Sequence, residues 1–205
     1  MSVPITPVPF RVAIFRLRDV CVRVQEGMRE HLKTASLDPR FQIEPTFRWL
    51  RRQGVDISLL SDYDAEQTDL LLTRLGWSVG PEGTVQSVVL EQEKQENPVA
   101  RALDVHGLRR EEAHQALVVV DTPRLLELAY RAGVGLQLGV TNGSHSYAAL
   151  HRVPHSALLD STLQLVNYLL HLTPAEELSA PARRLTFAWP RVLRGGADGL
   201  VAGPG

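Results

Sequence analysis

The sequence predicts an α/β fold of three layers, in which helices cover both faces of a parallel central sheet. Short apolar runs alternate along the chain with amphipathic segments of about ten residues. The runs are apolar almost throughout instead of alternating with polar residues, which is typical of strands buried on both faces. Glycines such as Gly54, Gly76 and Gly133 stand where the helical segments end.

The strands are predicted from runs rich in β-branched and aliphatic residues. The first run, FRVAIFRL, follows a proline-rich lead, and the run ALVVV is the most apolar of the set. The expected strands are, in order, 10–17, 55–60, 85–90, 116–120, 134–140 and 157–159.

The helices are predicted from helical spacing of apolar residues and from their end signals. Pro45, Pro98 and Pro123 stand at or near the first positions of three segments, where proline is tolerated. Leu71 and Leu75 share one face of a segment that stops at Gly76. The expected helices are 22–33, 46–53, 64–75, 98–105, 123–132, 146–151 and 161–171.

Composition restricts the classes of function. Lys and Arg number 22 against 23 Asp and Glu in 205 residues, so no global charge favours nucleic acid or an acidic membrane. No apolar run approaches the roughly 20 residues needed to span a bilayer. The only cysteine, Cys21, excludes an internal disulfide and is expected to be a small buried apolar residue. We expect a cytoplasmic protein.

One core domain is expected over residues 1–172, followed by a tail, 173–205, that is rich in proline and glycine. The tail either packs over the domain as a strip or serves as a docking peptide or strand donor. In parallel sheets, ligands bind beyond the carboxyl ends of the strands. The candidate site therefore comprises residues 16–19, 61–62, 121–122 and 141–145.

Several ordered motifs resemble those of the haloacid dehalogenase (HAD) superfamily, most closely its phosphonatase-like hydrolases. The resemblance spans about residues 10–170 and includes VVVDTP at 118–123, AYRAGV at 129–134, GVTNGSH at 139–145 and LLDS at 158–161. The segment 59–77, which begins LLSDYD, is similar to the phosphate loop of the family and its following helix. The resemblance implies a three-layer, Rossmann-like HAD fold.

The resemblance also implies that catalysis is impaired. In the family the first strand ends in Phe-Asp-x-Asp, where the first aspartate is the nucleophile and the second the acid and base. Here the same stretch reads Phe15-Arg16-Leu17-Arg18-Asp19, so Arg16 and Arg18 replace both aspartates. A guanidinium has no lone pair with which to attack phosphorus or bind Mg²⁺. The expected function is that of a pseudoenzyme, acting as a binding or interaction module.

The resemblance assigns binding roles to Ser61, Lys94, Asp121 and Thr122, of which Asp121 would be the metal ligand. Lys94 matches the family lysine only loosely, and Leu125 falls where a further acidic residue is usual. No cofactor is expected, or Mg²⁺ if the protein is an active hydrolase. The segment 22–44 is too short for the usual helical cap and is expected to be a short helical insert.

Three alternatives follow for the altered site. A salt bridge from Arg16 to Asp121 replaces the metal, or the arginines, Ser61 and backbone donors near Thr122 hold a phosphate-type anion without turnover. In the third, the protein is an active Mg²⁺-dependent hydrolase with a rearranged site that uses Asp19 or Asp121. Partners other than an anion, such as another protein or a second copy, stay open. A metal site at His151 and His155 is disfavoured because Pro154 interrupts their helix.

Overall fold

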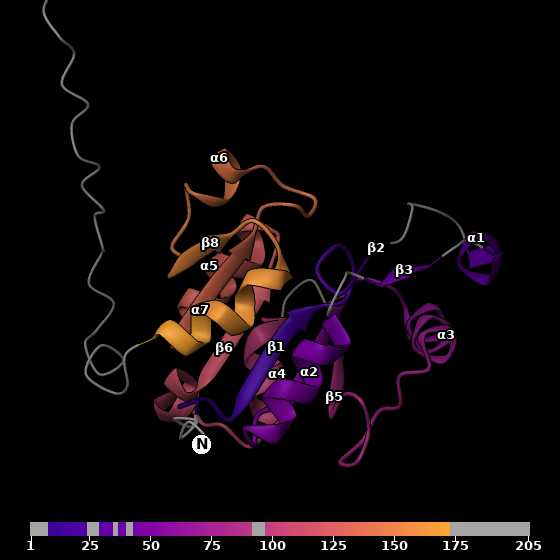
Figure 1. Cartoon of the computed structure of the whole chain (residues 1–205), viewed down its shortest axis with the longest axis horizontal. Helices are drawn as coiled ribbons and strands as arrows, with labels where there is room; N and C mark the ends of the chain where they lie inside the picture. Colours follow the sequence, from indigo (N-terminus) through magenta and orange to yellow (C-terminus); the bar gives the residue numbers. More distant parts are fainter. Residues whose placement is uncertain (1–7, 24–28, 35–36, 40–42, 92–96, 173–205) are drawn as a thin grey trace, which may run out of the picture.

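The computed structural model describes residues 8–23, 29–34, 37–39, 43–91 and 97–172 (Figure 1). Its centre is a sheet of six parallel strands in the order β5-β4-β1-β6-β7-β8. All six were predicted, with ends that shift by at most two residues. Their bounds are β1 Val12–Arg16, β4 Asp56–Ser61, β5 Ser87–Leu90, β6 Ala116–Val120, β7 Leu136–Val140 and β8 Ala157–Leu159.

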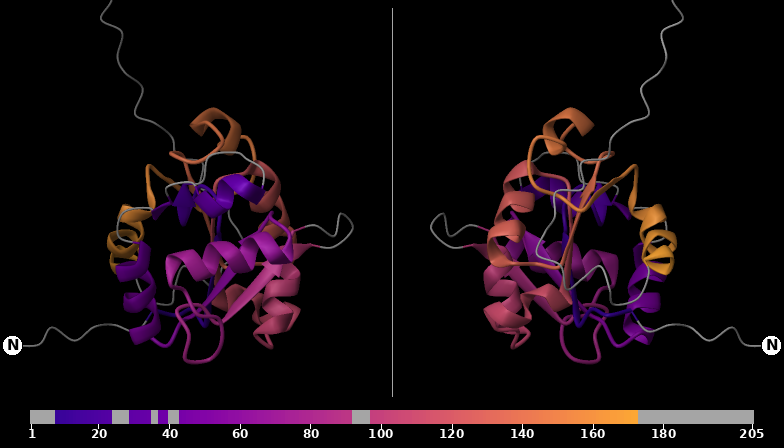
Figure 2. Two further views of the ribbon diagram at one scale, coloured as in Figure 1. Left: turned by 90° about the vertical axis from the view of Figure 1, so that its right-hand side faces the viewer. Right: turned by 90° about the vertical axis from the view of Figure 1, so that its left-hand side faces the viewer.

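Helices cover both faces of the sheet, which confirms the predicted three layers (Figure 2). On one face Phe15 of β1 packs with residues of α2, α3 and α7; on the other, Ile14 packs with residues of α4, α5 and α6. Successive strand residues point to opposite faces, so both neighbours are fully buried. The helices are α2 Ile43–Arg52, α3 Ala65–Leu75, α4 Pro98–Val105, α5 Pro123–Ala132, α6 Tyr147–Leu150 and α7 Leu165–His171. Two 3₁₀ turns, η1 Arg110–Gln115 and η2 Thr162–Gln164, complete this part of the chain.

The prediction of a helix over 22–33 is wrong at its start. Val22–Arg23 is a short strand, β2, which pairs antiparallel with β3 at Asp38–Pro39, and α1 covers only Arg29–Thr34 between them. The pairing partner lies well downstream, so local spacing of apolar residues did not reveal it. The cap assignment for 22–44 stays a prediction.

The described residues include no helix that is long and apolar enough to cross a membrane. Two predicted features, Lys94 and the tail 173–205, lie outside the described residues. Cys21 is a free thiol and is fully buried in the core, as predicted.

Candidate functional site

Polar side chains gather where the parallel strands end. Arg16 is the last residue of β1, Glu91 follows β5 directly, and Asp121 follows β6 directly. Asp62 comes after β4, and Ser144 lies in the loop after β7. Because parallel strands end at one edge of a sheet, residues that are far apart in the chain meet there.

Arg16 is the centre of this group. Its Nη1 donates to Asp121 Oδ1 at 2.8 Å, and its Nη2 donates to Asp62 Oδ2 at 2.9 Å. Its Nε lies 3.7 Å from Glu91 Oε1, an ion pair beyond hydrogen-bond range. The residue is only 5% exposed. Burial alone would lower the pKa of the guanidinium, but Asp121, with Asp62 and Glu91, leaves that pKa above its ordinary value.

Asp121 is completely buried, and both of its carboxylate oxygens are engaged. While Oδ1 accepts from Arg16, Oδ2 accepts from the backbone N–H and the hydroxyl of Ser144, each at 2.6 Å. The backbone at Gly143 approaches so closely that a Cβ there would lie 2.3 Å from the Asp121 Cβ. Burial, reinforced by the charge of Asp121, raises the pKa of the Cys21 thiol well above its ordinary value.

Two further arginines complete the charge balance. Arg18 forms an ion pair with Asp62 and lies over the Tyr63 ring, with its guanidinium carbon 5.8 Å from the ring centre. Arg124 lies 3.7 Å from Glu91 Oε2. Burial raises the pKa of Glu91, and Arg16 opposes that rise. We call these residues the strand-tip cluster: Arg16, Arg18 and Arg124 with Asp62, Glu91 and Asp121. Its three cations match its three carboxylates.

The two hydroxyls predicted to bind phosphate, those of Ser61 and Thr122, form hydrogen bonds with residues close to them in the chain. Ser61 Oγ lies 2.7 Å from Thr68 Oγ1 and accepts from the backbone N–H of Tyr63 at 3.3 Å. Thr122 caps α5 by accepting from the backbone N–H of Leu125, also at 3.3 Å.

Asp19 lies in the turn after β1 with a left-handed φ of 66°, and its backbone N–H donates to Val22 O at 2.8 Å.

The structure thus contains the salt bridge from Arg16 to Asp121 that the first alternative describes, and Arg18 pairs with Asp62 beside it. Sequence reasoning missed Glu91 and Arg124. Glu91 could have been found, because it follows a predicted strand in the same way as Asp121. Arg124 had no such signal, since it lies inside the helical segment that follows Asp121.

The residues at this edge do not fit a divalent cation. Mg²⁺ requires free oxygen ligands, but both oxygens of Asp121 are engaged and the guanidinium of Arg16 lies directly against one of them. Arginine nitrogens are donors only and cannot serve as ligands. Over the described ranges, no three His, Cys, Asp or Glu side chains are grouped so as to hold a metal ion, and this includes the surroundings of His151 and His155.

No protein-family model and no curated protein matches this chain. Many solved structures do match it in fold. A haloacid dehalogenase-like hydrolase from Streptococcus pneumoniae aligns with a TM-score of 0.60 and 12% identity, over 78% of this chain and 98% of that one. A candidate β-phosphoglucomutase from Thermotoga maritima has a TM-score of 0.64 and 12% identity, over 80% of this chain and 100% of that one.

A third similar structure is the cobalt-bound deoxy-D-mannose-octulosonate 8-phosphate phosphatase from Haemophilus influenzae. Its TM-score is 0.58 and its identity 12%, over 79% of this chain and 88% of that one. Structural similarity at identities this low shows a shared fold and leaves the activity open. Sheet order, layers and structural likeness agree, and the chain has the fold of the haloacid dehalogenase-like hydrolases.

Proposed function

We propose that this chain is a HAD-fold protein that does not carry out phosphoryl transfer and acts as a binding or interaction module. One observation carries the proposal: a buried guanidinium, that of Arg16, ends β1 and is hydrogen-bonded to Asp121 and Asp62. By the sequence resemblance, this position belongs to the nucleophilic aspartate. A guanidinium can neither attack phosphorus nor leave from an acyl phosphate.

The surroundings of Arg16 support the proposal. The hydrogen bonds to Asp121 and Asp62 keep the side chain at the strand end, because moving it away would take the paired cation from the fully buried Asp121. They also occupy oxygen atoms that a metal ion would need. The strand-tip cluster neutralises its own charges, so an anion entering here would compete with carboxylates already bound to the arginines.

The finer features of the proposal have separate support. The structural neighbours include a phosphatase in a cobalt-bound form, yet the donors at this edge do not suit a metal, so we propose that no cofactor is needed. The motifs quoted above support a phosphonatase-like origin. A single buried free thiol, Cys21, is typical of a reducing compartment and supports a cytoplasmic location.

An activity assay tests the proposal directly. The purified protein should hydrolyse p-nitrophenyl phosphate and acetyl phosphate with Mg²⁺ no faster than buffer. Turnover that disappears in Asp121→Ala or Asp19→Ala would instead establish the active hydrolase and overturn the proposal.

The substitution Arg16→Asp provides a second test. It replaces the cation with a fourth carboxylate beside Asp62, Glu91 and Asp121, which creates a cluster of oxygen ligands suited to Mg²⁺. Added Mg²⁺ should raise the melting temperature of this variant by binding the native state, and should leave that of the wild type unchanged. Arg16→Asn is the matched control and should respond less. An equal rise in the wild type contradicts the proposed role of Arg16.

A further inference from the structure

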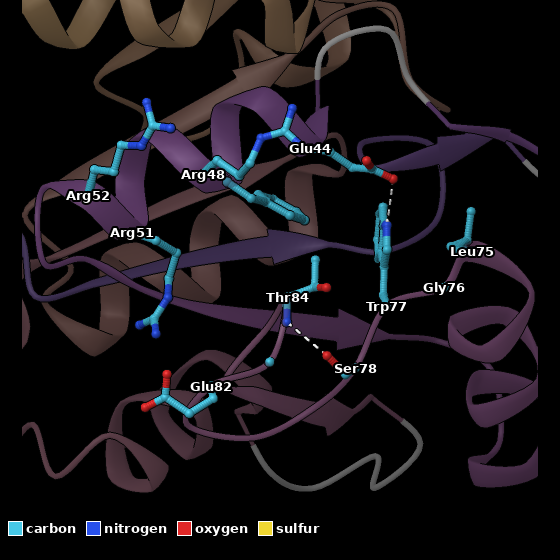
Figure 3. A pocket seen from close by; sticks show the side chains of 12 residues that line it. Glu44, Arg48, Arg51, Arg52, Leu75, Gly76, Trp77, Ser78, Glu82 and Thr84 are labelled. Atoms are coloured by element: carbon cyan, nitrogen blue, oxygen red, sulfur yellow. Dashed lines mark hydrogen bonds between the residues drawn. The ribbon is translucent and has the colours of Figure 1, made fainter.

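The cavity beside α2 is lined by side chains that already have structural roles. It measures about 540 Å³ and lies between α2 and the segment that joins α3 to β5 (Figure 3). Its two aromatic residues, Phe47 and Trp77, are 1% and 5% exposed and pack in the core. The side chains of Arg48 and Arg52 point away from the opposite segment (Figure 3). Neither ring therefore presents a free face to a ligand.

The loop after β7 instead contains a chemically reactive pair of residues, Asn142 and Gly143. This loop runs from Val140, which ends β7, to Tyr147, which begins α6, and the pair lies outside any helix or strand. Asn142 is exposed. Because glycine has no side chain, the backbone nitrogen of Gly143 is sterically open to the side-chain carbonyl carbon of Asn142. For this reason, asparagine followed by glycine is the pair most prone to deamidation.

The packing against Asp121 requires this glycine. A Cβ at residue 143 would lie 2.3 Å from the Asp121 Cβ. The next residue, Ser144, donates to Asp121 Oδ2 through its backbone N–H and its hydroxyl, each at 2.6 Å. A side chain at residue 143 would slow the attack on Asn142, but the loop would have to move to accommodate it. The close contact with Asp121 and the reactivity of Asn142 thus have the same origin.

We propose that Asn142 is a deamidation site and that its conversion to isoaspartate weakens the contact of the loop with Asp121. The Gly143 nitrogen attacks the side-chain carbonyl carbon of Asn142, and the new N–C bond closes a succinimide ring. The C–N bond of the side-chain amide breaks, and its nitrogen leaves as ammonia with the proton from Gly143. Water then opens the ring to aspartate or isoaspartate. The reaction is independent of whether the strand-tip cluster is catalytic.

The isoaspartate product disrupts the loop more than the aspartate product. In isoaspartate the main chain passes through the former side chain, which adds one carbon between residues 142 and 143. Ser144 then shifts relative to Asp121, at a place where even a Cβ on residue 143 does not fit. The hydrogen bonds from Ser144 lengthen, which is costly because Asp121 is fully buried. The aspartate product keeps the ordinary backbone and the position of Ser144.

Incubation of the folded full chain at pH 8 and 37 °C, followed by tryptic peptide mapping with mass spectrometry, tests the modification. The peptide that contains Asn142 should gain one mass unit, because a hydroxyl replaces an amino group. The chain has two other asparagines, which are internal controls in separate tryptic peptides. Asn97 precedes a proline, which has no N–H to attack. Asn167 is exposed like Asn142 but lies within α7 and precedes a tyrosine. Neither control should change over the same period.

Thermal melts of fresh and aged protein test the structural consequence. Ageing should lower the melting temperature by at least about 2–4 °C, as for the loss of one hydrogen bond in a chain of this size. Asn142→Gln should abolish both the mass gain and this loss, because its longer side chain closes a ring less readily. Fresh Asn142→Asp, which has the charge without the longer backbone, should melt close to the wild type.

The proposal is overturned if Asn142 gains no more mass than Asn167, or if aged Asn142→Gln loses as much stability as the aged wild type. A fresh Asn142→Asp that melts as low as the aged wild type would assign the loss to the charge and contradict the role of isoaspartate.

Discussion

At the scale of single residues, the structure depends on how the charge of Arg16 is compensated. The side chain is almost fully buried, and its ion pairs reach three carboxylates. Taking a guanidinium out of water costs several kcal/mol, which good geometry with opposite charges offsets. The compensation is mutual, because Asp121 and Glu91 are as buried as the arginine.

Arg16→Leu should therefore lower the free energy of unfolding by about 3–5 kcal/mol at pH 7, since it leaves the fully buried Asp121 without its paired cation. The loss should shrink at pH 4.5, where protonation removes part of the uncompensated negative charge. Urea denaturation at the two pH values measures both effects. Arg131→Leu, at an exposed position, should change stability by less than about 0.5 kcal/mol. An equal loss at both pH values would exclude the electrostatic explanation.

Gly143→Ala tests how tightly the loop after β7 holds Asp121. The added Cβ would lie 2.3 Å from the Asp121 Cβ and 2.5 Å from its Oδ2, so the loop must move and the hydrogen bonds from Ser144 must lengthen. We expect a loss of about 1–3 kcal/mol, as in other overpacked sites. Chemical denaturation measures it. A variant as stable as the wild type would show that the loop is free to move.

At the scale of elements, local signals predicted best those segments whose ends are fixed by their own side chains. Helix α3 was expected over 64–75, and it begins after Asp64 and ends before Gly76, which adopts a left-handed φ of 69°. The helix predicted to begin at Val22 was wrong there, because the structure of this segment depends on Pro39, its partner in the small sheet. No periodicity within a short window contains that information.

Asp64→Ala should lower the free energy of unfolding by about 1 kcal/mol. Its carboxylate accepts from the backbone N–H of Gln67 at 2.7 Å, and alanine removes this hydrogen bond. The backbone N–H of residue 64 also donates to Gln67 Oε1, and alanine retains that donor. The control is Asp69→Ala on the exposed side of the same helix, which should be neutral or slightly stabilising. Equal losses in the two variants would show that the cap contributes nothing specific.

At the scale of the whole molecule, the order of the strands assembles the site. Arg16 and Asp121 are 105 residues apart, and they meet because β1 lies between β4 and β6. The rule that sites follow the carboxyl ends of parallel strands identified most of the cluster from sequence. It could not show that Ser61 turns its hydroxyl toward Thr68, because side-chain direction depends on packing against α3.

At the opposite end of the sheet, His106 is expected to make the stability of the protein depend on pH. The His106 ring lies 2.8 Å from Ser87 Oγ through Nε2 and 3.4 Å from Asp56 Oδ2 through Nδ1. Burial lowers the pKa of His106, and Asp56 only partly opposes this. The native state therefore favours the neutral ring, so this contribution is complete above the ordinary pKa of about 6.5 and is lost as pH falls through the lowered value.

His106→Gln should flatten the fall in stability between pH 7.5 and pH 5, because the titrating group is gone. Urea denaturation across this range measures the slope. The exposed His171 provides the control, and His171→Gln should keep the slope of the wild type. A wild-type slope in His106→Gln would assign the acid sensitivity to other groups.

The position of β1 in the middle of the sheet also affects how the chain is made. β1 is synthesised before both of its neighbours, β4 and β6, and Val12 pairs with Ala116 of β6. At about 5–20 residues per second, the growing polypeptide carries this apolar strand with at least one side vacant for roughly 5–20 s. During that interval a nascent chain of this protein is an expected client of chaperones, and the sheet closes only after translation has passed β6.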